Sequence, residues 1–245
     1  TLNLSGIVID DVRQGAALIN DGTLSIDGAI IQNSAGDGLL NQGQAHIDNA
    51  LIQGNAGAGI VNTGTLEMGR SLILKNRQGV NNSGAFNIYQ HCEINDNAGA
   101  DVGGIDNSGT FTCTEYSYIY DNAGLLVGGV RNTNAMDVDD LIVHGNTGAN
   151  VGGIDNSGQI TLACVEIIQN QAANSSGTGG LWQHGADAQL TLWNYYYIGG
   201  NTCNGVRSNL GLDTGARIRF EGTDTFGKFG NPFVQVKINS LSILF

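Results

Sequence analysis

The chain repeats itself every 20 to 25 residues, and this repeat limits its fold more than any other feature. An Asn-x-Gly motif, or Asn-x-Asn in one case, starts at Asn20, Asn41, Asn62, Asn82, Asn107, Asn132 and Asn156. A second marker, an Ile or Val three residues before an Asn, keeps the same phase at Ile30, Ile52, Ile73, Ile94, Ile119, Val143, Ile167 and Ile198. A unit this short buries an apolar face only by stacking on its neighbours, so the repeat predicts a solenoid.

Apolar residues fall in fixed columns when the repeats are aligned on the first Asn. Four residues after it stand Leu24, Ala45, Leu66, Phe86, Phe111, Met136 and Ile160. Six residues after it stand Ile26, Ile47, Met68, Ile88, Cys113, Val138 and Leu162. Two apolar positions with a mostly polar one between them have the period of a strand that turns one face inward. Each repeat therefore predicts short strands separated by Gly and Asn corners.

The predicted fold is all-β: a right-handed, single-stranded parallel β-helix of about eight to ten coils, each of 20–25 residues. The composition agrees, because 38 Gly and 1 Pro with 13% charged residues leave little material for solvated amphipathic helices. Gly and Asn tolerate the positive φ of sharp corners, and Asn side chains in register can form amide ladders along the axis.

The repeat predicts three regions. Residues 1–204 form the β-helix domain, residues 205–232 form a Gly-rich irregular coil, and residues 233–245 form one or two apolar strands. The later repeats gain residues after the second Asn, in the stretches 98–104, 123–129, 147–153 and 171–180, which predicts a bulge at one corner.

The charge balance bears on partners. With 22 acidic and 10 basic residues, the net charge of -12 opposes binding to nucleic acid or anionic lipid. No apolar run approaches the roughly 20 residues of a spanning helix, so we expect no membrane insertion by this segment. The chain opens on Thr1 without Met or a leader-like block, which we interpret as a processed or excised segment.

Gly-Gly-apolar triplets occur at Gly103-Gly104-Ile105, Gly128-Gly129-Val130, Gly152-Gly153-Ile154 and Gly179-Gly180-Leu181. With the Ile-x-x-Asn marker, they make residues 15 to 205 resemble the right-handed parallel β-helix repeats of polymorphic outer-membrane proteins and autotransporter-type passengers. The resemblance implies export to the cell surface and a structural or adhesive role.

Our leading hypothesis is a non-catalytic, extracellular or cell-surface structural subunit that assembles as a homo-oligomer or homopolymer. Copies would join by end-to-end stacking or by donation of the C-terminal strand. The predicted assembly residues are Leu2, Leu4, Ile19, Leu40, Val61, Phe233, Val234, Val236, Ile238, Leu241, Ile243 and Phe245. The residue before the repeat Asn reads Asp106, Arg131 and Asp155 in successive repeats, which predicts a charge ladder that fixes the register.

Two other functions remain open. A polysaccharide hydrolase or lyase is suggested by Asp139-Asp140, His144 and Arg217-x-Arg219, although carboxyl pairs of the spacing that glycosidases need are not apparent. A glycan-binding adhesin, with polysaccharide as partner, is suggested by Tyr116, Tyr118, Trp193 and Tyr195.

The sequence predicts neither a metal site nor a cofactor. Corner aspartates such as Asp137, Asp139 and Asp140 lack the ligand spacing of a calcium loop, and the histidines lack zinc-site spacing. The four cysteines, Cys92, Cys113, Cys164 and Cys203, occupy different columns. A bridge between adjacent coils needs a shared column, so we favour free, buried thiols and leave disulfides as the alternative.

Overall fold

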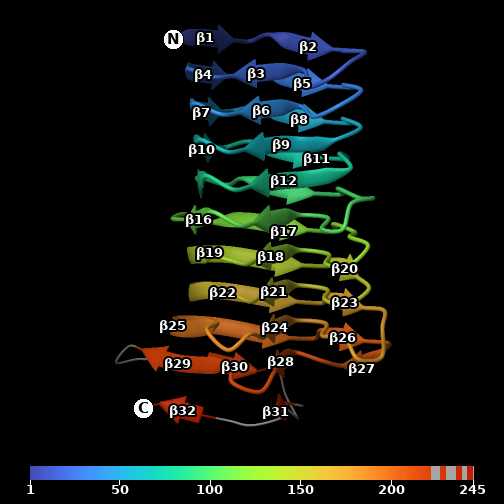
Figure 1. The fold of residues 1–245 in the computed structure, drawn as a ribbon, viewed down its shortest axis with the longest axis vertical. Helices are drawn as coiled ribbons and strands as arrows, with labels where there is room; N and C mark the ends of the chain where they lie inside the picture. Colours follow the sequence, from blue (N-terminus) through green and yellow to red (C-terminus); the bar gives the residue numbers. More distant parts are fainter. Residues whose placement is uncertain (222–226, 230–235, 239–241, 245) are drawn as a thin grey trace.

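The computed structural model describes residues 1–221, 227–229, 236–238 and 242–244. These residues form a parallel β-solenoid in which strands stack coil upon coil and none lies in a helix (Figure 1). The N-terminal coil is at one tip, and the last described strands are at the other. The predicted all-β solenoid is therefore confirmed.

Each coil has three short strands, which stack into three walls. The first wall contains β1 (Leu2–Ser5), β4 (Thr23–Asp27), β7 (Gln44–Asp48), β10 (Thr65–Gly69), β13 (Ala85–Tyr89), β16 (Thr110–Cys113), β29 (Arg217–Glu221) and β32 (Ser242–Leu244). The second wall contains β2 (Val8–Asp10), β5 (Ile30–Gln32), β8 (Leu51–Gln53), β11 (Leu72–Leu74), β14 (Glu93–Asn95), β17 (Ser117–Tyr120) and β30 (Gly227–Phe229). Three longer strands run from the first wall into the second: β19 (Ala135–His144), β22 (Gln159–Ile168) and β25 (Gln189–Gly199).

The third wall is a 10-stranded parallel sheet in the described residues. It contains β3 (Leu18–Asn20), β6 (Leu39–Asn41), β9 (Ala58–Asn62), β12 (Gln78–Asn82), β15 (Ile105–Asn107), β18 (Val130–Asn132), β21 (Ile154–Asn156), β24 (Leu181–Gln183), β28 (Leu210–Leu212) and β31 (Val236–Ile238). A small sheet at the lengthened corner contains β20 (Thr147–Gly148), β23 (Gln171–Ala172), β26 (Thr202–Cys203) and β27 (Val206–Arg207).

The core consists of columns of apolar side chains that superpose from coil to coil. Leu24 pairs with Ala45, which pairs in turn with Leu66, and all three are buried. The residues that stand six positions after each repeat Asn form a second column, from Ile26 to Leu162. They pair with one another from coil to coil in the same way, and all of them are buried. This confirms the predicted core columns.

Two ladders of buried side-chain amides run along the axis. In the first, Asn20 Nδ2 donates to Asn41 Oδ1 at 2.7 Å, and the chain of bonds continues through every repeat Asn to Gln183. The second joins Asn55, Asn76, Asn97, Asn122, Asn146, Asn170, Asn201 and Asn209. Each inner Asn amide is hydrogen-bonded to its neighbours in the coils above and below, whereas Nε2 of Gln183, at the end of the first ladder, is buried without a partner.

One predicted marker is wrong by a residue. The sequence analysis placed Ile30 and Asn33 in the second marker, but Ile31 pairs with Ile52, and Ile30 pairs outward with Leu51. Ser34, not Asn33, meets the ladder, because its backbone N–H donates to Asn55 Oδ1. Because Ile30 and Ile31 are adjacent, the repeat pattern alone does not show which of them faces the core in this coil.

The solenoid extends beyond residue 204. Within the predicted Gly-rich coil, β28 and β29 continue the third and first walls by pairing in register with β24 and β25. Beyond them, β31 pairs with β28 and β32 pairs with β29. The described parts of 233–245 thus add another layer to the chain's own walls.

A column of close approaches explains one set of glycines. Five of them directly precede a strand of the third wall, namely Gly38, Gly104, Gly129, Gly153 and Gly180, and two are the second residue of such a strand, namely Gly59 in β9 and Gly79 in β12. A Cβ built on Gly129 would lie 2.5 Å from the carbonyl oxygen of Gly153 in the next coil. The backbone pairing of adjacent coils therefore leaves no room for a side chain there.

Candidate functional site

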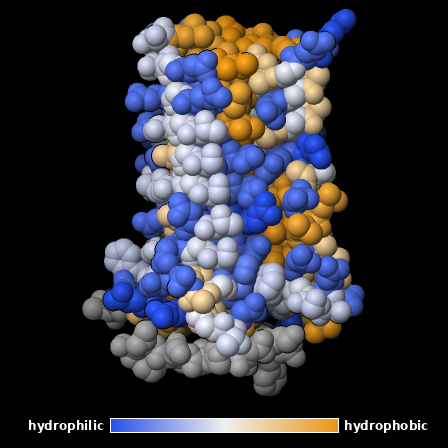
Figure 2. Space-filling view, viewed as in Figure 1, coloured by the Kyte–Doolittle hydropathy of each residue, from blue (hydrophilic) through white to orange (hydrophobic). Residues whose placement is uncertain are grey.

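An apolar stripe lies on the third wall near the N-terminal tip. Ile19, Leu40 and Val61 pair in one outward column, as the sequence predicted, and Ile19 is 57% exposed while the other two are half-buried. Figure 2 shows the stripe running from the tip down the wall until polar side chains replace it. The column continues as Asn81 and then Asp106.

The charged ladder follows in the same column. Arg131 donates from Nε to Asp106 Oδ1 at 2.8 Å and from a second guanidinium nitrogen to Oδ2. Asp155 pairs in register with Arg131, but its carboxylate lies 2.6 Å from Nε2 of His184. The hydrogen bond to Asp155 raises the pKa of His184. The predicted three-residue ladder is therefore divided into an Arg131–Asp106 ion pair and a hydrogen-bonded Asp155–His184 pair, and the sequence pattern did not predict His184.

The first coil exposes the core columns at the N-terminal tip. Leu2 pairs with Leu24 and Leu4 pairs with Ile26, so both occupy core columns. Leu2 is 48% exposed, whereas Leu24 is 1% exposed. Both predicted assembly residues therefore lie on the surface that another coil would cover.

The predicted C-terminal assembly residues are only partly placed. Val236 pairs with Leu210, Ile238 with Leu212, and Ile243 with Ile218, all by strand backbone. Phe233, Val234, Leu241 and Phe245 lie outside the described residues. The described strands of the tail thus pair with the chain's own walls, and not along the stripe of Ile19.

Aromatic rings gather on the outer surface of the second wall. Tyr116 meets Tyr118 edge-to-face with ring centroids 5.0 Å apart, and Tyr118 meets Tyr120 in the same way at 6.4 Å. Tyr120 stacks on His144 at 5.0 Å with the planes 1° apart. His91 packs edge-to-face on Tyr116, which is 40% exposed. These side chains come from β14 to β19 and from the corners before them.

A carboxylate lies among these rings. The hydroxyl of Tyr120 donates to Glu93 Oε2 at 2.7 Å. Burial and this hydrogen bond raise the pKa of Tyr120 to about 12, and the contact with Tyr116 raises the pKa of Tyr118 to about 12. The phenols therefore stay neutral, so they offer hydroxyl groups beside one fixed acceptor.

Trp193 and Tyr195 lie further along the same side of the solenoid, at the corner of β25. They are 47% and 46% exposed. The hydroxyl of Tyr195 donates to Glu166 Oε1 at 3.4 Å. The sequence analysis named both aromatic residues but missed Glu93 and Glu166, which directly precede second-marker residues. Because residues directly before the inward-facing marker point outward, their position in the repeat could have predicted both glutamates as surface residues of the second wall.

The residues of the enzyme hypothesis do not form one site. Asp139 shares a column with Ala163, Trp193 and Glu221, so three coil spacings, or about 14 Å along the axis, separate it from β29, which contains Arg217 and Arg219. Arg219 instead pairs with Glu221 at 2.5 Å. His144 stacks on Tyr120 beyond the corner that follows Asp139.

An acidic corner is the one place where grouped ligand atoms were found in the described residues. Ligand atoms of Asp139, Asp140 and Cys164 lie within 4.8 Å of one another. Desolvation and the nearby charge of Asp139 raise the pKa of Asp140, and burial, with the hydrogen bond that the thiol donates to Asp139, raises the pKa of Cys164. The group is partly exposed, and it gives no sign of a metal beyond the gathering of acids.

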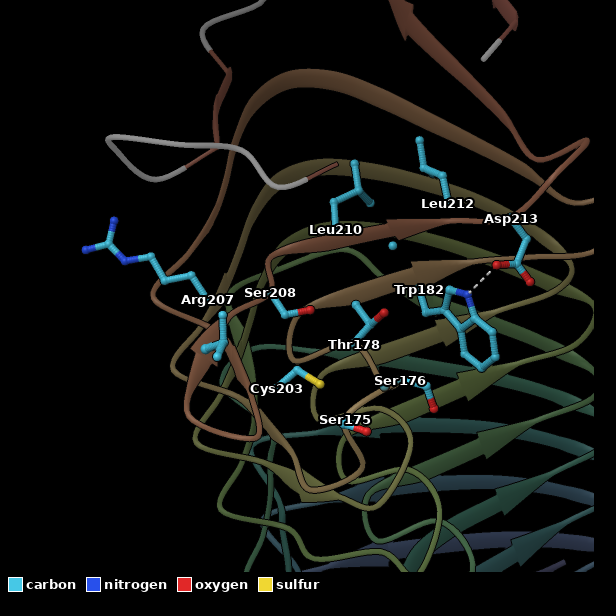
Figure 3. A pocket seen from close by; sticks show the side chains of 13 residues that line it. Ser175, Ser176, Thr178, Trp182, Cys203, Arg207, Ser208, Leu210, Leu212 and Asp213 are labelled. Carbon is cyan, nitrogen blue, oxygen red and sulfur yellow. Dashed lines mark hydrogen bonds between the residues drawn. The ribbon is translucent and has the colours of Figure 1, made fainter. Parts of the chain in front are cut away.

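A cavity of about 560 Å³ lies near the C-terminal end of the described solenoid. Figure 3 shows Trp182 and Asp213 on one side of it, joined by a hydrogen bond of 3.2 Å from the indole nitrogen to Oδ1. The thiol of Cys203 lines another side and donates to the carbonyl of Asn174 at 2.9 Å. The side chain of Arg207 extends away from the Trp182–Asp213 pair.

The four cysteines are free thiols in the structure. Burial raises the pKa of Cys92 to about 11 and that of Cys113 to about 12. Cys113 fills the core column six residues after Asn107, as predicted, and Cys92 and Cys203 are also buried, whereas Cys164 is only half-buried.

Comparison with known proteins gives no relative: no family model, curated protein or solved structure matches the chain. Among the described residues, no helix has the length and hydropathy of a membrane span.

Proposed function

We propose that this chain is a non-catalytic structural rod of an extracellular or cell-surface assembly, in which copies join end to end by stacking one coil on another. The proposal follows the resemblance to polymorphic outer-membrane proteins and autotransporter-type passengers. In this proposal the chain is a subunit of a homopolymer, and its role depends on its outer surface and its two ends and not on a catalytic cleft.

The exposed core column of the first coil carries the proposal. The strands β1 and β2 pair with β4 and β5 on one side. Leu2 is 48% exposed, although the residue paired with it is 1% exposed. A coil placed on this tip would bury Leu2 as fully as Leu24, which stabilises by about 1.5–3 kcal/mol for one large apolar side chain. It would also satisfy the backbone groups of the unpaired strand edges.

The described strands at both tips belong to the same first and third walls, which is the arrangement that head-to-tail stacking requires. The first wall runs in register from β1 to β32, and the third wall runs in register from β3 to β31. A copy that continues this register repeats the contact already made between coils. Such a heterologous contact does not close on itself and therefore propagates into a filament.

The catalytic alternative has less support. The acidic and basic groups that a polysaccharide hydrolase would use are separated by about three coils or are paired with other partners. Glycosidic hydrolysis needs two carboxyls on either side of one bond, roughly 5–9.5 Å apart. The structural role requires no such site.

Negative-stain electron microscopy and sedimentation velocity test the proposal. The wild-type chain should form end-to-end rods whose length increases with protein concentration. Leu2→Asp should prevent this, because a carboxylate would be buried in the contact. Leu125→Asp is a matched control, since Leu125 is 62% exposed at the lengthened corner. Single rods of wild-type protein at every concentration would refute the proposal.

A further inference from the structure

We propose that the outer surface of the second wall, between β14 and β25, binds a linear, neutral polysaccharide that lies parallel to the solenoid axis. The ligand would contact two Tyr–Glu units, Tyr120 with Glu93 and Tyr195 with Glu166. This binding role goes beyond the structural role, because a rod needs no row of aromatic side chains on its flank.

The first unit combines ring faces with a fixed acceptor. Tyr116, Tyr118 and Tyr120 form an edge-to-face row in which neighbouring ring planes are 80° and 82° apart. Glu93 is half-buried and already accepts the hydroxyl of Tyr120 at 2.7 Å. The carboxylate is thereby held in one orientation beside the rings, and a second acceptor lone pair remains for a ligand hydroxyl.

The second unit has the same donor and acceptor further along the axis, with Tyr195 two residues before the glutamate column and Tyr120 two residues after it. Tyr195 donates to Glu166 as Tyr120 donates to Glu93, and the glutamate stands in the coil before the tyrosine in both cases. Both glutamates occupy one outward column, which reads Glu93, Tyr118, Ile142 and Glu166 in successive coils. Three coil spacings separate them by about 14 Å along the axis.

The surface between the units suits a polymer better than two separate small ligands. Ile142 is half-buried in the same column, and Tyr118 stands beside it in the preceding coil. Parallel walls place all of these positions on one straight line. A linear ligand with a regular repeat would therefore meet an acceptor at each end and an apolar floor between them.

The side chains identify the ligand as a sugar polymer of a particular charge. A pyranose ring has an apolar C–H face, which stacks on the negative face of an aromatic ring, and hydroxyl groups at its edge, which donate to carboxylates. Acidic residues border the rings at Glu115 and Asp121, the sequence neighbours of Tyr116 and Tyr120. They repel polyanionic glycans, and the net charge of -12 adds to that repulsion. A neutral polysaccharide fits both observations.

Binding measurements with sugars of increasing length test the proposal. The probes are cello-, xylo- and manno-oligosaccharides from two to eight units, measured by isothermal titration calorimetry, and the corresponding neutral polysaccharides in affinity gels. For one of these series, affinity should rise steeply once the sugar spans about 14 Å, because the second contact becomes intramolecular. Polygalacturonate should not bind.

Variants assign the binding to the two units. Glu93→Gln combined with Tyr118→Ala, or Glu166→Gln combined with Tyr195→Ala, should each weaken the long sugar on the order of 100-fold and remove the length dependence. Tyr89→Ala is the matched control, because Tyr89 ends β13 in the first wall of the same coil. Circular dichroism and thermal melting of each variant show that the solenoid is intact.

The proposal would be overturned if no neutral sugar bound, or if polygalacturonate bound as well as the neutral sugars. Binding of the neutral sugars that both double variants retain would overturn it too. Poly-lysine is a further probe, and binding of poly-lysine alone would show that the surface recognises cations and not sugars. None of them affects the proposed stacking, which is measured without any sugar. A non-assembling Leu2→Asp variant that still binds the sugar separates the two proposals.

Discussion

Removing one amide from the inner ladder should destabilise the solenoid strongly, and Asn122→Ala is the sharpest case. Asn122 is fully buried. Its Nδ2 donates to the carbonyl of Ile94 at 2.8 Å and to Asn146 Oδ1 at 3.0 Å. Its Oδ1 accepts the backbone N–H of Asn97 at 3.1 Å and the Nδ2 of Asn97 at 2.9 Å. Alanine removes all four bonds and leaves buried donors and acceptors without partners.

The magnitude follows from these four bonds. Each contributes about 1 kcal/mol net, and a buried group that loses its partner costs about 1–3 kcal/mol, so the loss should be about 4 kcal/mol or more. Urea unfolding followed by circular dichroism measures it as a fall in the midpoint. Asn87→Ala is the control, because Asn87 is half-buried and accepts one bond, from Thr112 Oγ1. A loss below about 1 kcal/mol for Asn122→Ala, equal to the control, would refute the reasoning.

Three further predictions concern other parts of the solenoid. Gly129→Ala should cost about 1–3 kcal/mol by thermal melting, because its Cβ would meet a carbonyl 2.5 Å away, whereas Gly22→Ala, with nothing within 4 Å, should cost little. The hydrogen bond to Asp155 raises the pKa of His184 in the folded protein above its ordinary value of 6.5. The stability that this pair contributes is therefore full below pH 6.5 and is lost as the pH rises through the pKa of the folded protein. His184→Gln should remove this pH dependence of the melting temperature. Iodoacetamide at pH 8 should leave Cys113 unmodified until the chain unfolds, because burial raises its pKa to about 12; rapid modification of the folded protein would contradict this.

The core could be predicted from the sequence because several signals share one period. The alternation around Leu24 and Leu66, the repeat Asn and the glycines each recur in every coil, so a local ambiguity in one signal is corrected by the others. The ladder from Asn20 onward was predictable for the same reason, since only stacked coils place equivalent amides next to each other. Ile30 shows the limit: where Ile30 and Ile31 both fit the pattern, period alone cannot choose the inward residue.

The surface was harder to predict because it depends on how two columns meet across a corner. Aromatic residues such as Tyr116 were visible in the sequence, but the bond between Tyr120 and Glu93 requires both the register of β14 with β17 and the direction of each side chain. His184 escaped notice for a similar reason. It stands two residues after Trp182, the position paired with Asp155, and reaches back to the carboxylate across the coil.

The distance between two spin labels in one outward column tests the stacked-coil account most directly. Ser25 and Thr161 belong to the column that runs through His46, Glu67, Asn87, Thr112 and Asp137. Six coil spacings place them about 29 Å apart. Pulsed electron–electron resonance on the Ser25→Cys, Thr161→Cys protein, with Cys164→Ser to remove the half-buried thiol, should give one narrow distribution near that distance. A broad distribution, or one centred far from it, would contradict the account.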